Sequence, residues 1–338
     1  ITTAGNPLIF NGYIETYYSY DFNNPIDNNK PAFLYNHNRH NEFNLNLGFI
    51  RGSYNAEKVR ASLAIAAGTY MNANYAAEQG VLKNIYEANA GFKIGKKNLW
   101  LDAGIFPSHI GFESAIGKDN WTLTRSIVAE NSPYYEAGAK LTYTTNNNNW
   151  LFSGLALNGW QRIKRVEGNS LMSFGTQITH KPTSSVTLNY STFIGTDKPD
   201  SVRQMRYYHN IYGILQLSKQ FGLTAGFDIG TEEISNTNSD MNTWYSPVLI
   251  AKFLINDNWS LTARGEYYKD KKGVIISTGT SNGFNTTGVS LNVDYAPSAF
   301  MLFRTELRYS NSRDDIFTRD NTSKRTSSFV TTSIALSF

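Results

Sequence analysis

The chain has 338 residues, a formal net charge of +4 and no cysteine, so disulfides, zinc–thiolate centres and thiol nucleophiles are excluded. Its mean hydropathy is −0.39, and no apolar run approaches the roughly 20 residues of a membrane helix, which excludes a helical membrane protein. The basic surplus is small, 31 residues against 27 acidic ones, and forms no stripe, so nucleic acid is not an expected partner.

Aromatic side chains are unusually frequent, with 21 Tyr and 20 Phe. A transmembrane β-barrel needs such residues for the girdles at its two membrane interfaces. A soluble all-β protein with an aromatic core is the alternative that the composition leaves open. The first residues, ITTAGNPLIF, lack the basic and apolar pattern of a signal peptide, so we expect that such a peptide has been removed.

The whole chain is a succession of short runs in which apolar residues alternate with polar or small ones. The last run, 328–338, places Val330, Ile334 and Phe338 on one side and Ser333 on the other. Because successive side chains of a strand point to opposite faces, each run predicts a strand with one apolar face. We expect about sixteen strands, centred near residues 14, 47, 65, 90, 102, 139, 154, 176, 190, 212, 226, 249, 264, 290, 305 and 333.

The connections between these runs alternate in length. Short breaks, rich in Asn, Gly, Pro and Ser, fall at 55–58, 95–98, 145–149, 181–185, 218–221, 256–258 and 296–299. Longer breaks fall near 23–41, 72–84, 107–132, 161–170, 196–205, 231–242, 270–284 and 311–325. This alternation predicts an all-β fold: a transmembrane antiparallel up-and-down β-barrel of about 16 strands, with short periplasmic turns and long extracellular loops. We expect one domain, residues 1–338, integral in the cell outer membrane, whose first strand (7–22) pairs with the last to remove both edges.

Three runs allow their faces to be assigned to lipid or lumen. In the run 59–71, the residues expected to face lipid are Val59, Ala61, Leu63, Ile65, Ala67 and Met71, and those expected to face the lumen are Arg60, Ser62, Gly68 and Tyr70. In two later runs, the lipid-facing residues are Trp259, Leu261, Ala263, Tyr267, Met301, Phe303, Leu307 and Tyr309, and the lumen-facing ones are Ser260, Thr262, Arg264, Glu266, Asp270, Arg304, Glu306 and Arg308. Because an Arg in lipid at the midplane costs about 2–4 kcal/mol, this segregation of charge fixes the register.

The inward charges of the late runs are the first candidate functional residues. Arg264 and Glu266 lie two residues apart, as do members of the set Arg304, Glu306 and Arg308, and Asp294 lies on the run between them. Facing ladders of opposite charge can narrow a lumen and tune ion selectivity. We therefore expect these residues to line a water-filled pore. The alternative is a filled lumen in which the charges satisfy one another and stiffen the wall.

The longest break, residues 107–132, is the expected constriction. It contains Glu113 and Arg125, and a loop folded into a lumen must replace its lost solvation by charge-assisted hydrogen bonds to the wall. We expect both residues to approach the ladder of Arg264, Arg304 and Arg308. Three ladder arginines against two ladder glutamates favour a weak anion preference. An ordinary surface loop is the alternative.

The segments LDAGIFPSHIGFE (101–113), NW (120–121), TRS (124–126) and PYYEAGAKLTY (133–143) carry a resemblance. They resemble the OmpL-like β-barrel porin-2 family, as do ARGEYYKDKKG (263–273) and FRTELRYS (303–310), and Thr124 stands where the family pattern has Ser. The matching motif residues are Gly104, Phe106, Gly111, Glu113, Asn120, Arg125, Ser126, Pro133, Tyr134 and Gly138. The resemblance implies an outer-membrane channel of no particular substrate, in an outer membrane of the Bacteroidota type.

Three functions stay open on this basis. Passive diffusion of small polar solutes or ions through a charged lumen is the main hypothesis. A non-conducting structural or adaptor barrel, part of a larger outer-membrane complex, is the second. Uptake of one specific nutrient is the third, since Tyr13 and Tyr17 are expected to face the lumen.

No catalytic residue, metal or cofactor is expected. The five histidines are scattered and none belongs to a nucleophile or metalloprotease motif. Calcium in the oxygen-rich segments 21–29 and 311–321 stays open, although neither has a defined ligand spacing. The expected partners are outer-membrane lipid and lipopolysaccharide, small polar solutes or ions, and a homo-oligomer or an envelope complex.

Overall fold

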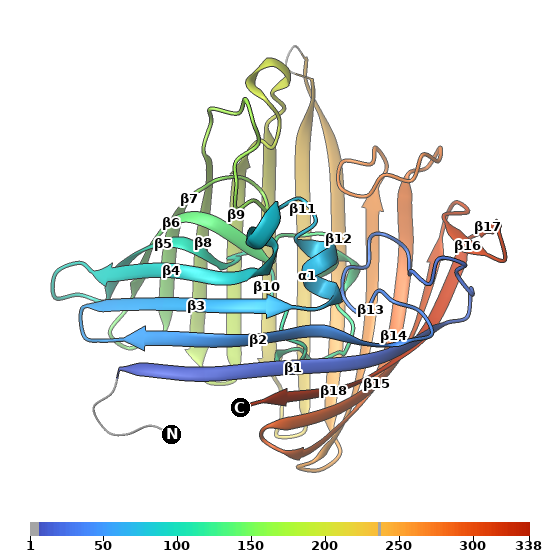
Figure 1. The fold of residues 1–338 in the computed structure, drawn as a ribbon, viewed down its shortest axis with the longest axis horizontal. Coiled ribbons are helices and arrows are strands. Elements are labelled where there is room, and N and C mark those ends of the chain that lie inside the picture. The colour runs from blue at the N-terminus through green and yellow to red at the C-terminus, as the bar shows by residue number, and fades with distance from the viewer. Residues whose placement is uncertain (1–6, 236–237) are drawn as a thin grey trace.

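The computed structural model describes residues 7–235 and 238–338. Over these residues, sixteen antiparallel strands form one closed barrel, in which β1 pairs with both β2 and the last strand, β18 (Figure 1). The first half of the wall consists of β1 (Leu8–Asp21), β2 (Phe43–Asn55), β3 (Val59–Ala67), β4 (Ile85–Lys93), β5 (Leu99–Pro107), β6 (Tyr135–Thr144), β7 (Trp150–Leu157) and β8 (Ser173–Thr183). The second half consists of β9 (Val186–Gly195), β10 (Arg206–Gln216), β11 (Phe221–Ser235), β12 (Asn238–Leu254), β13 (Trp259–Asp270), β14 (Phe284–Ser298), β15 (Met301–Ser312) and β18 (Thr326–Ser337). The predicted barrel, its strand number and its closure are confirmed.

The remaining elements lie in the long loops. They are α1 (Thr69–Asn74), η1 (Gly80–Asn84), η2 (Gly117–Asp119), α2 (Ile127–Glu130), η3 (Asp200–Val202) and the hairpin of β16 (Phe317–Arg319) and β17 (Thr322–Lys324). None of the helices within the described parts of the chain is long and apolar enough to cross a bilayer.

All sixteen predicted strand centres lie inside strands, but one predicted loop is wrong. Residues 231–242 do not form a long loop, because β11 runs to Ser235 and β12 begins at Asn238, while residues 236–237 lie outside the described part. The ladder continues through the pair Glu232 and Asn242. The polar side chains of this segment suggested a loop. A hairpin that projects into water is held by backbone hydrogen bonds alone, so its sequence need not show the apolar alternation of a membrane strand.

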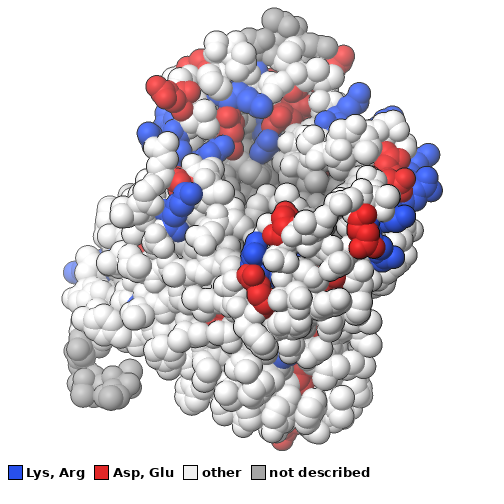
Figure 2. Space-filling model, turned by 45° about the vertical axis from the view of Figure 1, so that its right-hand side comes forward, with Lys and Arg blue, Asp and Glu red and all other residues white. Residues whose placement is uncertain are grey.

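The outer face of the wall is apolar, as the alternation predicts. Leu249 and Leu307 are 50% and 53% exposed, whereas their neighbours in sequence, Ile250 and Glu306, are buried. In the space-filling view, charged side chains gather around the loop end, and the wall below them carries few (Figure 2). This surface is suited to contact with lipid, with charge confined to the ends and the interior.

One facing assignment is wrong. Met71 was expected to face lipid, but β3 ends at Ala67 and Met71 belongs to α1, where it is 1% exposed inside the barrel. Gly68 causes the change of direction, because its φ of 135° is open mainly to glycine and an added Cβ would lie 2.3 Å from the Asn46 carbonyl oxygen. The chain therefore turns inward at Gly68, and α1 enters the lumen.

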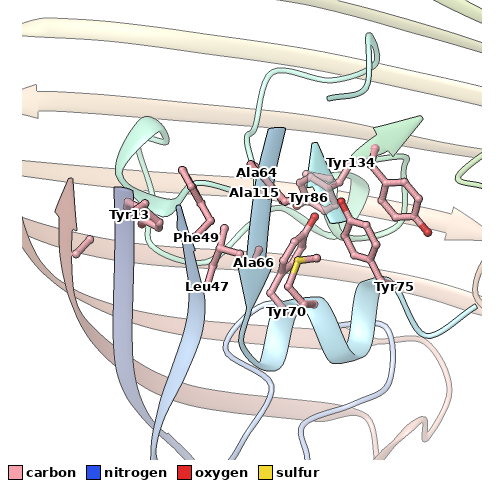
Figure 3. Close-up of a cluster of buried hydrophobic side chains, with 14 of the residues drawn as sticks. Tyr13, Leu47, Phe49, Ala64, Ala66, Tyr70, Tyr75, Tyr86, Ala115 and Tyr134 are labelled. Carbon is pink, nitrogen blue, oxygen red and sulfur yellow. The ribbon is translucent and has the colours of Figure 1, made fainter. Parts of the chain in front are cut away.

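The lumen contains an aromatic cluster contributed by loops and wall (Figure 3). Tyr70 from α1 lies edge-on to Tyr134, with ring centres 5.7 Å apart, and the rings of Tyr75 and Tyr135 stack at 3.9 Å. Burial of large aromatic rings is the main stabilising term available to a loop that leaves water. The first part of the loop 68–84, residues 69–75, is thus part of the barrel interior, whereas η1 has no buried residue.

Candidate functional site

The loop 108–134, between β5 and β6, folds across the lumen, and its own side chains give it a fixed shape. The Arg125 guanidinium is 0% exposed and donates to the carbonyl oxygens of Ser114, Ala115 and Leu123, at 2.5–2.9 Å. The Glu113 carboxylate accepts from the Ser126 backbone N–H at 3.1 Å. Buried backbone groups need partners, and here two charged side chains supply them from within the loop. The prediction that this segment enters the lumen is confirmed.

The wall arginines bind the backbone of this loop. Arg304 donates to the carbonyl oxygens of Gly117 at 2.7 Å and Asn120 at 3.0 Å, and Arg308 donates to that of Arg125 at 2.7 Å. Arg264 donates to the Thr124 carbonyl oxygen at 2.6 Å. All three guanidinium groups are nearly inaccessible to solvent.

The wall carboxylates complete the same set of bonds. Glu306 accepts from the Thr124 backbone N–H and Glu266 from the Ile127 backbone N–H, each at 2.5 Å. Glu306 also pairs with Arg264 at 2.9 Å, and Glu266 with Arg308 at 2.6 Å. Asp294 holds Arg304 through two bonds, at 2.7 and 2.9 Å. The β13–β15 wall therefore presents ionised donors and acceptors that match the loop backbone, and such bonds are stronger than neutral ones.

The structure brings all eight predicted site residues into one cluster, but their contacts differ in part from the expectation. Glu113 lies 4.0 Å from Arg264, as expected for a loop acid facing the ladder. Arg125 approaches Arg308 only with its backbone carbonyl, since its guanidinium is turned into the loop. The side chains of the eight residues contact the loop and one another, and each of these side chains is at most 5% exposed.

The loop is held at its root by its own residue His109, whose ring bonds to β6 and β9 of the wall. His109 Nδ1 lies 2.9 Å from both carboxylate oxygens of Glu136, and Nε2 lies 2.8 Å from the Thr192 carbonyl oxygen. An ionised carboxylate and a carbonyl oxygen can only accept, so donation by both ring nitrogens, as in an imidazolium, matches this geometry. Burial opposes that charge, but the Glu136 carboxylate prevails and raises the pKa of His109.

A second loop, 22–42, rests on the first. The Glu130 carboxylate in α2 accepts from the Tyr35 backbone N–H at 2.9 Å and from the Asn36 backbone N–H at 3.2 Å. Burial raises the pKa of Glu130 to about 7. The carboxyl group that joins the two loops therefore changes its protonation state near neutral pH.

The Glu130 link predicts a dependence of stability on pH. Because the folded pKa is raised, the folded chain retains a proton between about pH 4.5 and 7 that the unfolded chain has lost, so the contribution of Glu130 to stability falls as pH rises through this window. Because glutamine does not titrate, we expect the stability of Glu130→Gln relative to wild type to be higher at pH 8 than at pH 5. Urea unfolding in lipid vesicles at both values measures the difference. Glu57→Gln, in an exposed turn, should show no such change, and equal differences at both pH values for Glu130→Gln would contradict the prediction.

Open space remains on the other side of the loop, along β2–β8. Cavities of about 460, 350 and 400 Å³ follow one another from the loop to the periplasmic turns. The first two share Arg51 and Glu87, and the last two share Arg60 and Lys140. These three cavities form a charged path between loop and wall that the predicted ladder does not line.

The charges of this path are mostly paired. Arg51 lies 3.1 Å from Glu87, and Arg60 makes two short bonds to Asp102. Lys140 has no carboxylate within ion-pair distance among the described residues, and its ammonium lies 4.6 Å above the Phe106 ring. Alternation in the sequence identified only Arg60 as a lumen residue, and the other four charges were missed because they occur singly on four different strands. Their alternation with exposed neighbours such as Ala90 and Leu141 was the available signal.

Residues 7–338 match the model of the family described as "Putative beta-barrel porin-2, OmpL-like". The chain belongs to this family. The motif residues of this β-barrel porin-2 protein build the folded loop: Asn120 bonds Ser114 and Ile116, Arg125 bonds three loop carbonyls, and Ser126 caps α2. Gly104 has a φ of 129°, and an added Cβ would lie 2.2 Å from the Ala88 carbonyl oxygen, so only glycine fits beside β4.

Solved outer-membrane proteins share the fold at low identity. An anion-selective porin from Comamonas acidovorans is 8% identical, with a TM-score of 0.64, over 98% of this chain and 99% of that one. The outer membrane channel DcaP of Acinetobacter baumannii is 11% identical (TM-score 0.65; 100% and 99% covered), and the trimer form of OmpT from Vibrio cholerae is 7% identical (TM-score 0.62; 98% and 99%). No curated protein matches the chain.

Proposed function

We propose that this β-barrel porin-2 protein lets small polar solutes and ions diffuse passively across the outer membrane. The observation that carries the proposal is the charged path along β2–β8, which leads from the folded loop to the periplasmic turns. Family membership supports it, and so does the closed barrel with an apolar outer face. The loop 108–134 is then the constriction, and the eight clustered residues hold it in place.

A liposome-swelling assay with neutral solutes of graded size tests passive diffusion. Purified protein should admit small polyols at a rate that falls steeply with solute size, because the three cavities of the path each hold only 350–460 Å³. Swelling rates equal to those of protein-free liposomes for every solute would reject the proposal. They would favour a non-conducting adaptor barrel, for which the near-complete burial of Arg264, Arg304 and Arg308 is the supporting observation.

Selectivity should depend on Lys140. The two path arginines face carboxylates, so Lys140 contributes the uncompensated charge and favours anions weakly. Lys140→Ser is expected to move the reversal potential in a salt gradient towards cation preference. The matched control is Lys219→Ser, which removes the same charge from an exposed periplasmic turn. An unchanged reversal potential for Lys140→Ser would show that ions take another route.

Assembly into a homo-oligomer is a further part of the proposal. Ala61, Ala90, Ala103, Ala139 and Ala156 are direct cross-strand partners on the outer face of β3–β7, so this part of the wall is low and flat. Small residues let membrane-embedded surfaces approach closely. Chemical crosslinking in native outer membranes tests this assembly. Detection of the monomer alone after crosslinking would reject the proposed homo-oligomer. Lipid and lipopolysaccharide are the proposed partners of the remaining apolar wall.

A further inference from the structure

A cavity of about 730 Å³ lies at the extracellular end of the barrel, between the loop 22–42 and the last loop. In Figure 1 the blue segment that follows β1 runs beside the hairpin of β16 and β17. The polar residues that line the cavity are Asp21, Asn23, Asn24, Asp27, Asn29, Lys30, Tyr35, Asn38, Thr318, Asp320 and Asn321. A volume of this size is typical of sites for small ligands.

The two walls of this cavity are joined by specific contacts. Arg319 in β16 donates to the Asn23 side-chain oxygen at 3.0 Å, and the rings of Phe33 and Phe317 lie 6.2 Å apart. Within the loop, the Lys30 backbone N–H donates to the Asn38 carbonyl oxygen at 2.8 Å. The segments 21–29 and 311–321, which the sequence analysis singled out for their oxygen content, thus meet in one preformed site.

Two polar atoms in this site lack a partner within the described residues. The Asn38 side-chain oxygen is buried without a hydrogen bond. The backbone N–H of Tyr35 donates to Glu130, but the hydroxyl group of Tyr35 makes no hydrogen bond in the described parts of the chain. A buried oxygen without a partner is costly, and rotation of the Asn38 amide towards a bound ligand that donates to it would remove that cost.

The charges of the cavity select among ligand classes. An anion is disfavoured, because three aspartates line the cavity and the Lys30 ammonium is turned away, to the Thr331 hydroxyl at 3.1 Å and the Phe329 ring at 3.8 Å. A divalent metal ion is disfavoured, since the described residues contain no group of three Asp, Glu, His or Cys side chains suited to one. The amides of Asn23 and Asn29 are already hydrogen-bonded within the protein, which leaves those of Asn24, Asn38 and Asn321, each with both a donor and an acceptor, beside the Tyr35 ring.

We propose that this cavity binds a neutral, hydroxyl-rich solute of the saccharide class. Amide groups can donate to and accept from adjacent hydroxyl groups, while a ring face covers the apolar C–H face of a sugar. The role of such binding, which is to concentrate the solute at the mouth of the lumen, rests on the proposed porin function. The binding itself does not depend on conduction.

Calorimetric titration of the purified full chain with maltose, in an amine-oxide detergent that carries no sugar, tests the proposal. We expect binding in the millimolar range, weakened at least threefold by Tyr35→Phe and by Asn38→Leu. Tyr20→Phe is the matched control, because Tyr20 lies on the lipid-facing side of β1, and its affinity should equal that of wild type. Circular dichroism establishes that each variant retains the barrel.

Two results would overturn the proposal. One is the absence of maltose binding to wild type, and the other is equal affinity in wild type and both cavity variants. Binding of choline without binding of maltose would also overturn it, in favour of an organic cation. Bilayer conductance of the same preparation is measured separately, so that loss of the porin function is not mistaken for loss of this site.

Discussion

Replacing Glu266 and Glu306 together with alanine is expected to free the loop 108–134 and raise single-channel conductance at least twofold. The two carboxylates accept from the loop at the Thr124 and Ile127 backbone N–H groups. They also neutralise Arg308 and Arg264, and removal of one partner from a buried pair costs about 3–5 kcal/mol. The arginines then need water, and water can enter only if the loop moves. Single-channel recording in planar bilayers measures the change.

The matched control for this variant is Glu57→Ala, which removes a carboxylate from an exposed turn and should leave conductance unchanged. Heat-modifiable mobility on a gel shows whether the double variant still forms a barrel. A folded double variant with the conductance of wild type would mean that the ladder stiffens the wall and does not hold the constriction.

Leu249→Arg is expected to lower the free energy of unfolding by about 2–4 kcal/mol, the second largest effect, because it places a charge on the lipid face near the middle of β12. Leu249 is 50% exposed and lies between Ala225 and Gly265 on the neighbouring strands, which offer no polar partner. Leu217→Arg, a similarly exposed leucine after the end of β10, should cost much less, since it lies in a periplasmic turn. Urea unfolding in lipid vesicles compares them. Equal costs would contradict the assignment of this surface to lipid.

The barrel was predictable because each strand meets two uniform environments. Along β13 and β15, every second residue is at least partly exposed and most of these residues are apolar, while the residues between them are buried, so the sequence pattern and the exposure pattern coincide. The failures occur where the chain leaves this rule. Met71 follows the apolar alternation into α1, and the polar residues 231–242 continue a ladder that water surrounds.

The candidate site was predictable only in part. The spacing of residues along a strand shows which charges face the lumen, but it does not show which groups those charges contact. The ladder of Arg264, Arg304 and Arg308 was placed on the correct face, but its contacts with loop carbonyl groups depend on where the loop lies. The open path was missed because Arg51 and Lys140 come together only when β2 and β6 close into the same wall. Alternation determines the face of each residue, whereas the loop determines which part of the lumen stays open.

Conductance of the purified wild-type chain in planar bilayers is the most direct test of the central claim, that this barrel is a porin narrowed by its own loop. We expect stable conductance steps and a weak anion preference in a salt gradient. Insertion of folded barrels that produce no steps at any applied voltage would contradict it.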